Sequence, residues 1–280
     1  MSDPRPLLEL RCELGEGPFW DARTGRLHWV DILGCRLHGC REDGSDLRSL
    51  AVQSHLGAAA PWPGGFIAAT RDALGLLEPS GAFRPLPQSP RLAPTLRFND
   101  GKCDPAGRFW VGTMAYDGAP GAGALYRVEP DGAVAQVLDG VTISNGLAWD
   151  LAKGRMYYID TATRRLDAFD WDAATGGIRN RRCVAAFPEA GGWPDGMTLD
   201  RQGRAWIAFW DGWKVLCLDP DSGATVAELQ LPVQRPTSCA FGPGGHTLFI
   251  TSARTGLAPA DLARQPAAGA VFQVPLRPLP

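Results

Sequence analysis

The chain has 280 residues, with 28 basic against 30 acidic side chains and a formal net charge of -2. This balance argues against an electrostatic nucleic-acid binder, which needs a basic surplus. Hydrophobic residues make up 45% of the chain, too many for disorder. There is no apolar run of about 18 residues, the length that crosses a membrane. The N-terminus lacks the apolar core of a secretory signal, and the seven cysteines form no CxxC pair. We therefore expect a cytoplasmic protein with reduced thiols.

A repeat runs along the chain. Four segments begin with a carboxylate or amide, have glycine one or two residues later, and reach aspartate after five steps; they are residues 16–21, 99–104, 145–150 and 195–200. A glycine follows each segment, and then an apolar strand at 27–32, 109–112, 156–159 and 205–208. Aspartate and glycine are typical of tight turns between strands. The unit recurs about every 40–50 residues, the length of a four-stranded propeller blade.

Two weaker copies, at residues 60–67 and 240–250, bring the number of blades to six. Third strands are expected at 36–40, 74–78, 124–128, 165–170, 214–218 and 270–274. Residues 7–11 are expected to supply the strand that closes the ring, and residues 259–264 the only short helix. The sequence thus predicts an all-β fold, a six-bladed β-propeller with a central metal-binding channel, as one domain over residues 1–280.

The repeat places four oxygen-bearing side chains around that channel: Glu16, Asn99, Asn145 and Asp195 all lie five residues before the turn aspartate. Innermost strands line the channel of a propeller, so these side chains should converge at one height. Unpaired carboxylates and amides are costly to crowd together, and hard cations take oxygen ligands. For a single Asn-Gly or Asp-Gly pair, a solvated turn residue is the simpler interpretation. Four pairs in register favour a cation site.

Further residues are candidates for contacts at the channel mouth. Arg97 lies two residues before Asn99, so on a strand both point to the same side, although a surface arginine is the alternative. Asp117 lies in a loop that could cover the site or be merely solvated. Trp193 and Trp210 lie near Asp195 and could wall a pocket. Trp29, Trp110 and Trp206 recur in the repeat and are expected in the core.

Other signals of chemistry are weaker. The segments that begin at Asp170 and Asp219 resemble the start of a calcium-binding EF-hand loop, but the twelfth position holds Arg181 or Gln230 instead of glutamate. The four histidines have no metal-ligand spacing, and His28 lies within a strand pattern. HExxH and GxSxG motifs are absent from the sequence, so a histidine-dependent nucleophile has no support.

An ordered set of short motifs resembles the family of senescence marker protein 30, gluconolactonase and the luciferin-regenerating enzyme, which includes regucalcin. The matching stretches are residues 14–18, 97–102, 104–108, 112–114, 143–147, 194–197 and 237–239. The resemblance implies a six-bladed propeller with one divalent metal held by Glu16, Asn145 and Asp195. It also implies sugar-lactone contacts from Arg97 and Asn99, and an acid/base role for Asp195. Asp117 is the nearest match to an acidic substrate contact of the family, although its side chain is one methylene shorter than the family's acidic residue.

The function implied by this resemblance is metal-dependent hydrolysis of a sugar γ- or δ-lactone to the aldonic acid, by a monomer. Calcium is the first choice of metal, and Zn²⁺, Mn²⁺, Mg²⁺ and Fe²⁺ remain open because two carboxylates and an amide suit all of them. Two alternatives stay open as well. One is a phosphotriesterase-like hydrolase, and the other is a non-enzymatic propeller that binds calcium or a protein partner.

Overall fold

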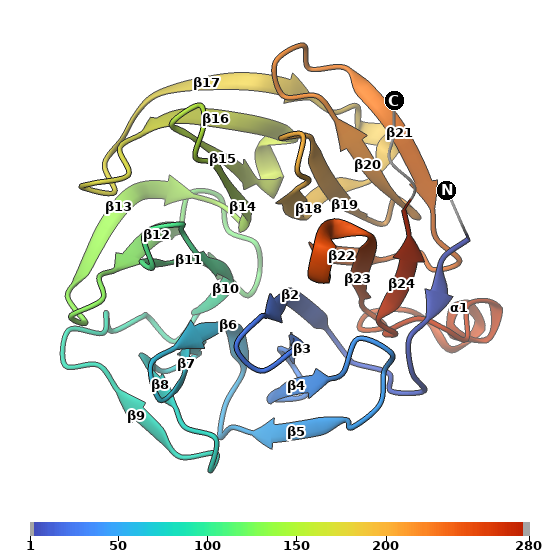
Figure 1. Cartoon of the computed structure of the whole chain (residues 1–280), viewed down its shortest axis with the longest axis horizontal. Helices are drawn as coiled ribbons and strands as arrows, with labels where there is room; N and C mark the ends of the chain where they lie inside the picture. The colour runs from blue at the N-terminus through green and yellow to red at the C-terminus, as the bar shows by residue number, and fades with distance from the viewer. Residues whose placement is uncertain (1–2, 277–280) are drawn as a thin grey trace.

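Six four-stranded sheets form a ring in the computed structural model, which describes residues 3–276 (Figure 1). In five of the sheets the strand that comes first in the chain lies nearest the centre, and the later strands follow outward in chain order. In the sixth sheet, the outermost strand comes from the N-terminal segment. This arrangement confirms the predicted six-bladed β-propeller. Among the described residues there is no helix with the length and apolar character needed to cross a membrane.

The blades follow the chain from the N-terminus, and we number them 1 to 6. Blade 1 has β2 (Gly15–Asp21), β3 (Arg26–Asp31), β4 (Arg36–Cys40) and β5 (Arg48–Ala51). Blade 2 has β6 (Leu56–Trp62), β7 (Gly65–Thr70), β8 (Leu74–Leu77) and β9 (Phe83–Pro85). Blade 3 has β10 (Leu96–Cys103), β11 (Phe109–Ala115), β12 (Gly123–Val128) and β13 (Val134–Val141).

The second half of the ring repeats this order. Blade 4 has β14 (Ser144–Asp150), β15 (Arg155–Asp160), β16 (Arg165–Trp171) and β17 (Ile178–Ala186). Blade 5 has β18 (Trp193–Leu199), β19 (Ala205–Trp210), β20 (Lys214–Leu218) and β21 (Thr225–Gln230). Blade 6 has β22 (Pro236–Phe241), β23 (Thr247–Ser252) and β24 (Phe272–Pro275), and β1 (Arg5–Pro6) is its outermost strand. The helical segments are η1 (Thr161–Thr163), η2 (Glu189–Gly191), η3 (Pro243–Gly245) and α1 (Pro259–Arg264).

The turn aspartates of the repeat hold the hairpin between the first and second strands. Each accepts a backbone N–H from the turn that follows it, at 2.9–3.0 Å: Asp21 from Arg23, Asp104 from Ala106, Asp150 from Lys153 and Asp200 from Gln202. The EF-hand-like segments are turns as well, because Asp172 and Asp219 accept N–H groups of their own loops. The turn aspartates and glycines of the repeat therefore specify the hairpins that connect the first and second strands of the blades.

The core lies between neighbouring blades, in six hydrophobic clusters. Trp110 and Trp206 each pack towards the following blade, and their indole N–H groups donate to the turn aspartates Asp104 and Asp200. Trp29 is also fully buried but packs towards blade 6, the preceding one. The predicted burial of all three tryptophans is confirmed. The prediction that Trp29 occupies the same strand position as Trp110 and Trp206 is wrong by one residue, because in the strand pairing that position is His28.

The N-terminal segment joins blade 6 to blade 1. Strand β1 pairs with β24, with Arg5 opposite Gln273 and Pro6 opposite Phe272. The pairing strand thus lies earlier than residues 7–11, where a strand was expected. Those residues still tie the ends of the ring together, because Leu7 N donates to Val271 O and Cys12 N donates to Gly269 O, both at 2.8 Å.

Candidate functional site

The innermost strands carry β-bulges at one end of the channel. The pairing of each with its neighbour is interrupted between Glu16 and Phe19, Phe98 and Gly101, Ser144 and Leu147, and Pro194 and Met197. A bulge releases side chains from the ladder and re-aims them, and bulges are frequent next to active sites. The four oxygen-bearing side chains that were predicted around the channel lie at or inside these bulges and line one cavity. We call them the ring residues: Glu16, Asn99, Asn145 and Asp195.

Close approach of neighbouring strands explains the glycines of the Asn-Gly and Asp-Gly pairs. A Cβ on Gly146 would lie 2.7 Å from Asp195 O, and a Cβ on Gly196 would lie 2.1 Å from Ser238 Oγ. These pairs therefore lie in strands at the blade contacts and do not form the turns that such dipeptides commonly indicate.

A hydrogen-bond network fixes the two amides of the ring. Arg97 Nη1 donates to Asn99 Oδ1 at 2.7 Å. Asn99 Nδ2 donates to Ser144 O at 2.8 Å and to Asn145 Oδ1 at 3.1 Å. Asn145 Nδ2 in turn donates to Thr161 Oγ1 at 2.8 Å. Both amide nitrogens thus bond to protein atoms, which orients the Asn145 oxygen.

The two carboxylates of the ring have fewer partners. Glu16 Oε2 accepts the Gly17 N–H at 2.9 Å. Asp195 Oδ1 is buried with no hydrogen-bond partner among the described residues. Burial, together with the charge of Asp100, raises the pKa of Glu16 to about 8. Burial and the charges of Glu16 and Asp100 raise the pKa of Asp195 well above its usual value.

These observations fit a divalent cation. An orphaned buried carboxylate oxygen is costly, and a cation would satisfy it while favouring the ionised form of both acids. The available donors are all oxygen atoms of carboxylate and amide groups, which hard cations prefer. Glu16, Asn145 and Asp195 could therefore hold such an ion, as the sequence predicted, and their roles stay predictions.

Sequence reasoning missed two charged residues next to the ring. Asp100 is 4% exposed and accepts the Gly101 N–H at 2.7 Å, and burial raises its pKa. Lys102 Nζ donates to Met197 O at 2.7 Å, and burial lowers its pKa. The signal was present, because both belong to the Asn-Asp-Gly-Lys segment that contains Asn99. Three carboxylates therefore share the channel with two cationic groups.

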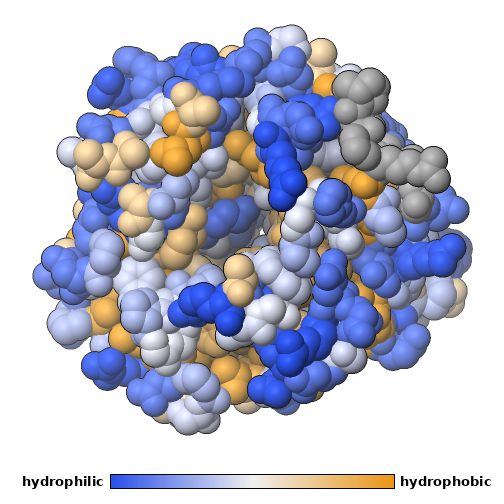
Figure 2. Space-filling model, viewed as in Figure 1, coloured by the Kyte–Doolittle hydropathy of each residue, from blue (hydrophilic) through white to orange (hydrophobic). Residues whose placement is uncertain are grey.

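A cavity of about 560 Å³ lies over the ring, and the central hollow of the molecule is visible in Figure 2. One part of its wall is polar, with Arg97, Thr142, Thr161 and Thr255 beside the four ring residues. The other part is apolar or aromatic, formed by Leu14, Leu33, Met114, Tyr116, Pro120, Ile143, Ala162, Trp193 and Trp210. The cavity lining thus combines polar side chains with apolar and aromatic ones.

Arginine side chains make cation–π contacts with the two tryptophans that line the cavity. The Arg164 guanidinium lies 3.4 Å from the ring centroid of Trp193, and that of Arg235 lies 4.6 Å from Trp210. Such cation–π contacts orient exposed aromatic rings. Both tryptophans line the cavity, in agreement with the wall that the sequence suggested.

Arg97 and Asp117, the other two predicted substrate contacts, are placed differently. Arg97 is 8% exposed and lines the cavity. Asp117 is exposed, and its Oδ1 accepts the Ala119 N–H at 3.0 Å within its own turn. Its neighbours Tyr116 and Gly118 line the cavity, whereas Asp117 is not among the lining residues of the described chain. A substrate contact by Asp117 stays a prediction that needs this loop to turn.

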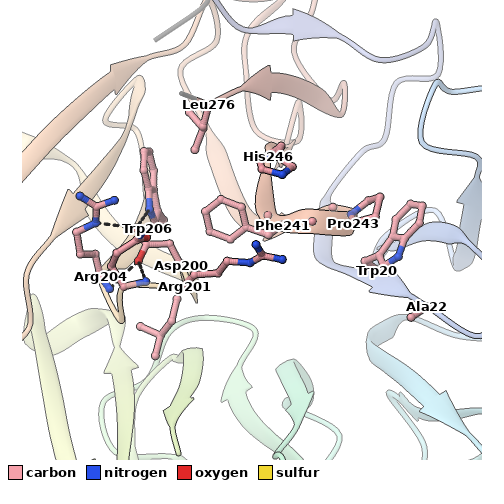
Figure 3. Close-up of a pocket in the computed structure, with 15 residues that line it drawn as sticks. Trp20, Ala22, Asp200, Arg201, Arg204, Trp206, Phe241, Pro243, His246 and Leu276 are labelled. Atoms are coloured by element: carbon pink, nitrogen blue, oxygen red, sulfur yellow. Dashed lines mark hydrogen bonds and ion pairs between the residues drawn. The ribbon is translucent and has the colours of Figure 1, made fainter. Parts of the chain in front are cut away.

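A second large cavity, about 700 Å³, lies at the other end of the innermost strands (Figure 3). It is lined by Trp20, Phe241 and His246 and by residues of the turn after β18. Its carboxylate, Asp200, is satisfied by Arg204 Nε at 2.8 Å and Trp206 Nε1 at 3.1 Å, the bonds dashed in Figure 3. This cavity therefore lacks the unpaired oxygen ligands of the ring.

The propeller and its channel site define a class of protein, and the chain belongs to it: the SMP-30/gluconolactonase/LRE-like family, whose sequence model matches residues 14–254. This confirms the family resemblance seen in the sequence motifs. Regucalcin of Danio rerio is 38% identical over 272 residues, which cover 96% of this chain and 92% of the relative.

A Bacillus subtilis (strain 168) protein provisionally named a sugar lactone lactonase, YvrE, is 36% identical over 271 residues, which cover 96% of this chain and 93% of that protein. A solved structure of a calcium-binding protein, regucalcin, from Agrobacterium tumefaciens str. C58 superimposes with a TM-score of 0.90 at 29% identity. It covers 97% of this chain and 92% of that one. The chain is thus similar to these relatives over almost its full length.

Proposed function

We propose that the protein is a metal-dependent hydrolase of sugar γ- or δ-lactones. The observation that carries the proposal is the unpaired, buried Asp195 Oδ1 in the same cavity as Glu16 and Asn145, with Arg97 and Asn99 beside them. Family membership and the lactonase name of the Bacillus subtilis relative support the same reaction class.

Glu16, Asn145 and Asp195 would hold one divalent ion, for which the calcium-binding relative makes Ca²⁺ the first choice. Zn²⁺, Mn²⁺, Mg²⁺ and Fe²⁺ are compatible with the same oxygen donors. A bound ion would supply Lewis-acid polarisation of the lactone carbonyl and a lowered pKa for water.

Asp195 would act as the acid/base. It accepts a proton from the attacking water, and the remaining hydroxyl forms a bond to the carbonyl carbon. When the bond between that carbon and the ring oxygen breaks, Asp195 returns the proton to the ring oxygen. One water is consumed and the product is an aldonic acid.

Arg97 and Asn99 would orient the sugar. Arg97 Nη1 already bonds Asn99 Oδ1, so the two side chains form one rigid polar edge of the cavity. Such an edge can hold hydroxyl groups so that the carbonyl carbon meets the water in a near-attack geometry. The aromatic sides would contact the less polar face of the substrate.

The decisive experiment is a panel of aldonolactones, assayed by acid release with and without each divalent metal. Asp195→Asn, which keeps an oxygen ligand but removes the base, should retain one bound ion and lose about 10²–10⁴-fold in kcat. Asp139→Asn, at an exposed position on β13, is the matched control and should leave kcat unchanged.

Two other functions would emerge from the same panel. The apolar and aromatic part of the cavity wall favours a phosphotriesterase-like activity as the second candidate, so a phosphotriester belongs in the panel. Wild-type protein with full metal occupancy that hydrolyses neither class would overturn the enzymatic proposal. The non-enzymatic calcium-binding propeller would then be the better account.

A further inference from the structure

A second group of metal-ligating side chains lies in blade 1, at the place where the N-terminal segment enters the ring. Cys12 precedes β2, Asp31 ends β3, and His38 is in the middle of β4. Their ligand atoms all lie within 4.8 Å of one another. The three residues are 1%, 6% and 3% exposed, respectively, and none of them belongs to the lining of the channel cavity.

Asp31 has a structural role that blade 4 shares. Its carboxylate accepts the N–H groups of Glu13 at 3.0 Å and Leu14 at 3.1 Å, which precede β2. In blade 4, Asp160 accepts the N–H groups of Thr142 and Ile143, which precede β14, at 3.0 and 2.9 Å. The carboxylate is therefore held in place by the blade architecture, with or without a metal.

Blade 4 lacks the other two ligands, which makes it an internal comparison. Counted from the capped N–H groups, the position of Cys12 in blade 4 is Val141. His38 lies opposite Trp29 in the strand pairing, and the corresponding residue of blade 4, Asp167, lies opposite Tyr158. The aspartate cap thus works without a thiol or an imidazole, so blade architecture does not explain their presence in blade 1.

His38 is prepared for metal binding. Its Nδ1 lies 2.7 Å from Ser49 Oγ, which fixes the ring and leaves Nε2 available. Metal-ligating histidines usually have such a partner on the other nitrogen.

Cys12 lies beside a buried donor that needs an acceptor. Trp29 Nε1 is buried without a hydrogen-bond partner within the described part of the chain, and the indole is one of the groups that favour the Cys12 thiolate. Burial and the Asp31 charge outweigh it and raise the pKa of Cys12 to about 12. The sulfur is therefore a neutral thiol until a cation replaces its proton.

We propose that Cys12, Asp31 and His38 form a second metal site, which takes a borderline cation such as Zn²⁺. A set of one sulfur, one nitrogen and one oxygen donor suits Zn²⁺ and related transition metals, whereas Ca²⁺ and Mg²⁺ prefer oxygen alone. On binding, the S–H bond of Cys12 breaks, a sulfur–metal bond forms, and the proton leaves to solvent. The ion would link the N-terminal segment to β3 and β4, where blades 6 and 1 meet.

Cobalt is the probe that separates this site from the channel. Co²⁺ replaces Zn²⁺ and gives a thiolate-to-metal charge-transfer absorption in the near ultraviolet, which oxygen-only sites do not give. We would titrate the full-length, metal-free protein with Co²⁺ in excess Ca²⁺ and follow this absorption. We expect one equivalent per chain to develop the band, in wild type and in Glu16→Gln alike.

Variants then assign the ligands. Cys12→Ser should lose the band, while Cys40→Ser, a buried cysteine of the same hydrophobic cluster, should keep it. His38→Gln leaves the thiol in place and should weaken Co²⁺ binding at least tenfold, so the proposal can be tested even if Cys12→Ser fails to fold. Absence of the band from wild type and Glu16→Gln, or its survival in folded Cys12→Ser, would overturn the second site.

Discussion

At the scale of single residues, the two ring carboxylates differ in what they lack. Glu16 Oε2 has the Gly17 N–H, whereas Asp195 Oδ1 has no partner among the described residues although it is buried. Both pKa values are raised, mainly by burial. A bound cation would satisfy the unpaired Asp195 oxygen and favour the ionised form of both carboxylates, which is the form of Asp195 that can accept a proton from water.

Substitution of Arg97 can distinguish substrate binding from metal binding. The Arg97 side chain bonds Asn99 and lines the cavity, but we propose that the ion is held by others. Arg97→Ala should keep one bound ion per chain. It should lower kcat/KM roughly 10–100-fold, because a hydrogen bond to a charged group contributes about 1.5–3 kcal/mol. A loss seen mainly in KM would indicate equal contact in ground and transition states.

The matched control is Arg84→Ala, at an exposed position on β9, which should change neither quantity. Both variants must be compared at saturating metal, so that weak metal binding does not imitate lost chemistry. Loss of the ion from Arg97→Ala would contradict the separation of roles.

Glu16 gives the metal-free protein a pH-dependent stability. Its folded pKa of about 8 lies above the ordinary value of 4.5, so the folded state binds the proton more tightly than the unfolded chain. Stability is therefore greatest below pH 4.5 for this group and is lost as pH rises through the folded pKa. The melting temperature of the metal-free protein should therefore fall as the pH is raised from 4.5 to 8.

Glu16→Gln should flatten that fall in part, since Asp100 and Asp195 also have raised pKa values. Saturating Ca²⁺ should remove it in the wild type, because a bound cation favours the ionised carboxylates. A melting temperature that rises from pH 5 to pH 8 without metal would contradict the assignment.

Residue types and spacing predicted the ring but not its full charge. Glu16, Asn99, Asn145 and Asp195 were recognisable because they recur in register with the turn aspartates, whereas the family resemblance, not the register, singled out Glu16, Asn145 and Asp195 as the metal ligands. Asp100 falls outside that register by one residue, and alternation along a regular strand would point it away from the channel. The bulge between Phe98 and Gly101 interrupts that alternation, and a bulge leaves little trace in a single sequence.

At the scale of strands, the close approach of strands from neighbouring blades explains why the site requires glycine. The first strands of blades 4 and 5 approach so closely that a side chain at residue 146 would contact the Asp195 carbonyl and Met197 Cγ, 2.7 and 2.8 Å from its Cβ. The strands themselves were predictable from apolar runs between Asp/Gly turns. The contact between two of them was not, because it depends on the ring.

Gly146→Ala tests this contact. We expect it to cost about 1–3 kcal/mol, the range for overpacking a tight site, and to weaken metal binding, because the strain falls between Asn145 and Asp195. Chemical denaturation and metal titration would measure the two effects. Gly177→Ala is the control, since its nearest neighbour is Thr175 Oγ1 at 3.2 Å in an exposed turn, and it should change neither by more than about 0.5 kcal/mol.

At the scale of the whole molecule, the fold followed from repetition. Each blade buries its faces mainly against its neighbours, as the six clusters show, so recognising the repeat predicts the arrangement of all six blades. The closing strand was harder to place, because within the described residues β1 pairs through only Arg5 and Pro6, and it has no repeat of its own. Its position depends on β24, which is distant in the sequence.

Deleting residues 1–12 should therefore open the ring. The deletion removes β1, the Leu7 and Cys12 backbone bonds to Val271 and Gly269, and two buried and two partly buried side chains of the cluster between blades 6 and 1. Burial of Leu7 alone is worth about 1.5–3 kcal/mol, and the exposed edge of β24 would be free to pair with other chains.

Size-exclusion chromatography of the deletion variant should show aggregation in place of the monomer expected for the full chain, and the melting temperature should fall. A truncated protein that stays monomeric with unchanged melting would show that blades 6 and 1 hold together without this segment.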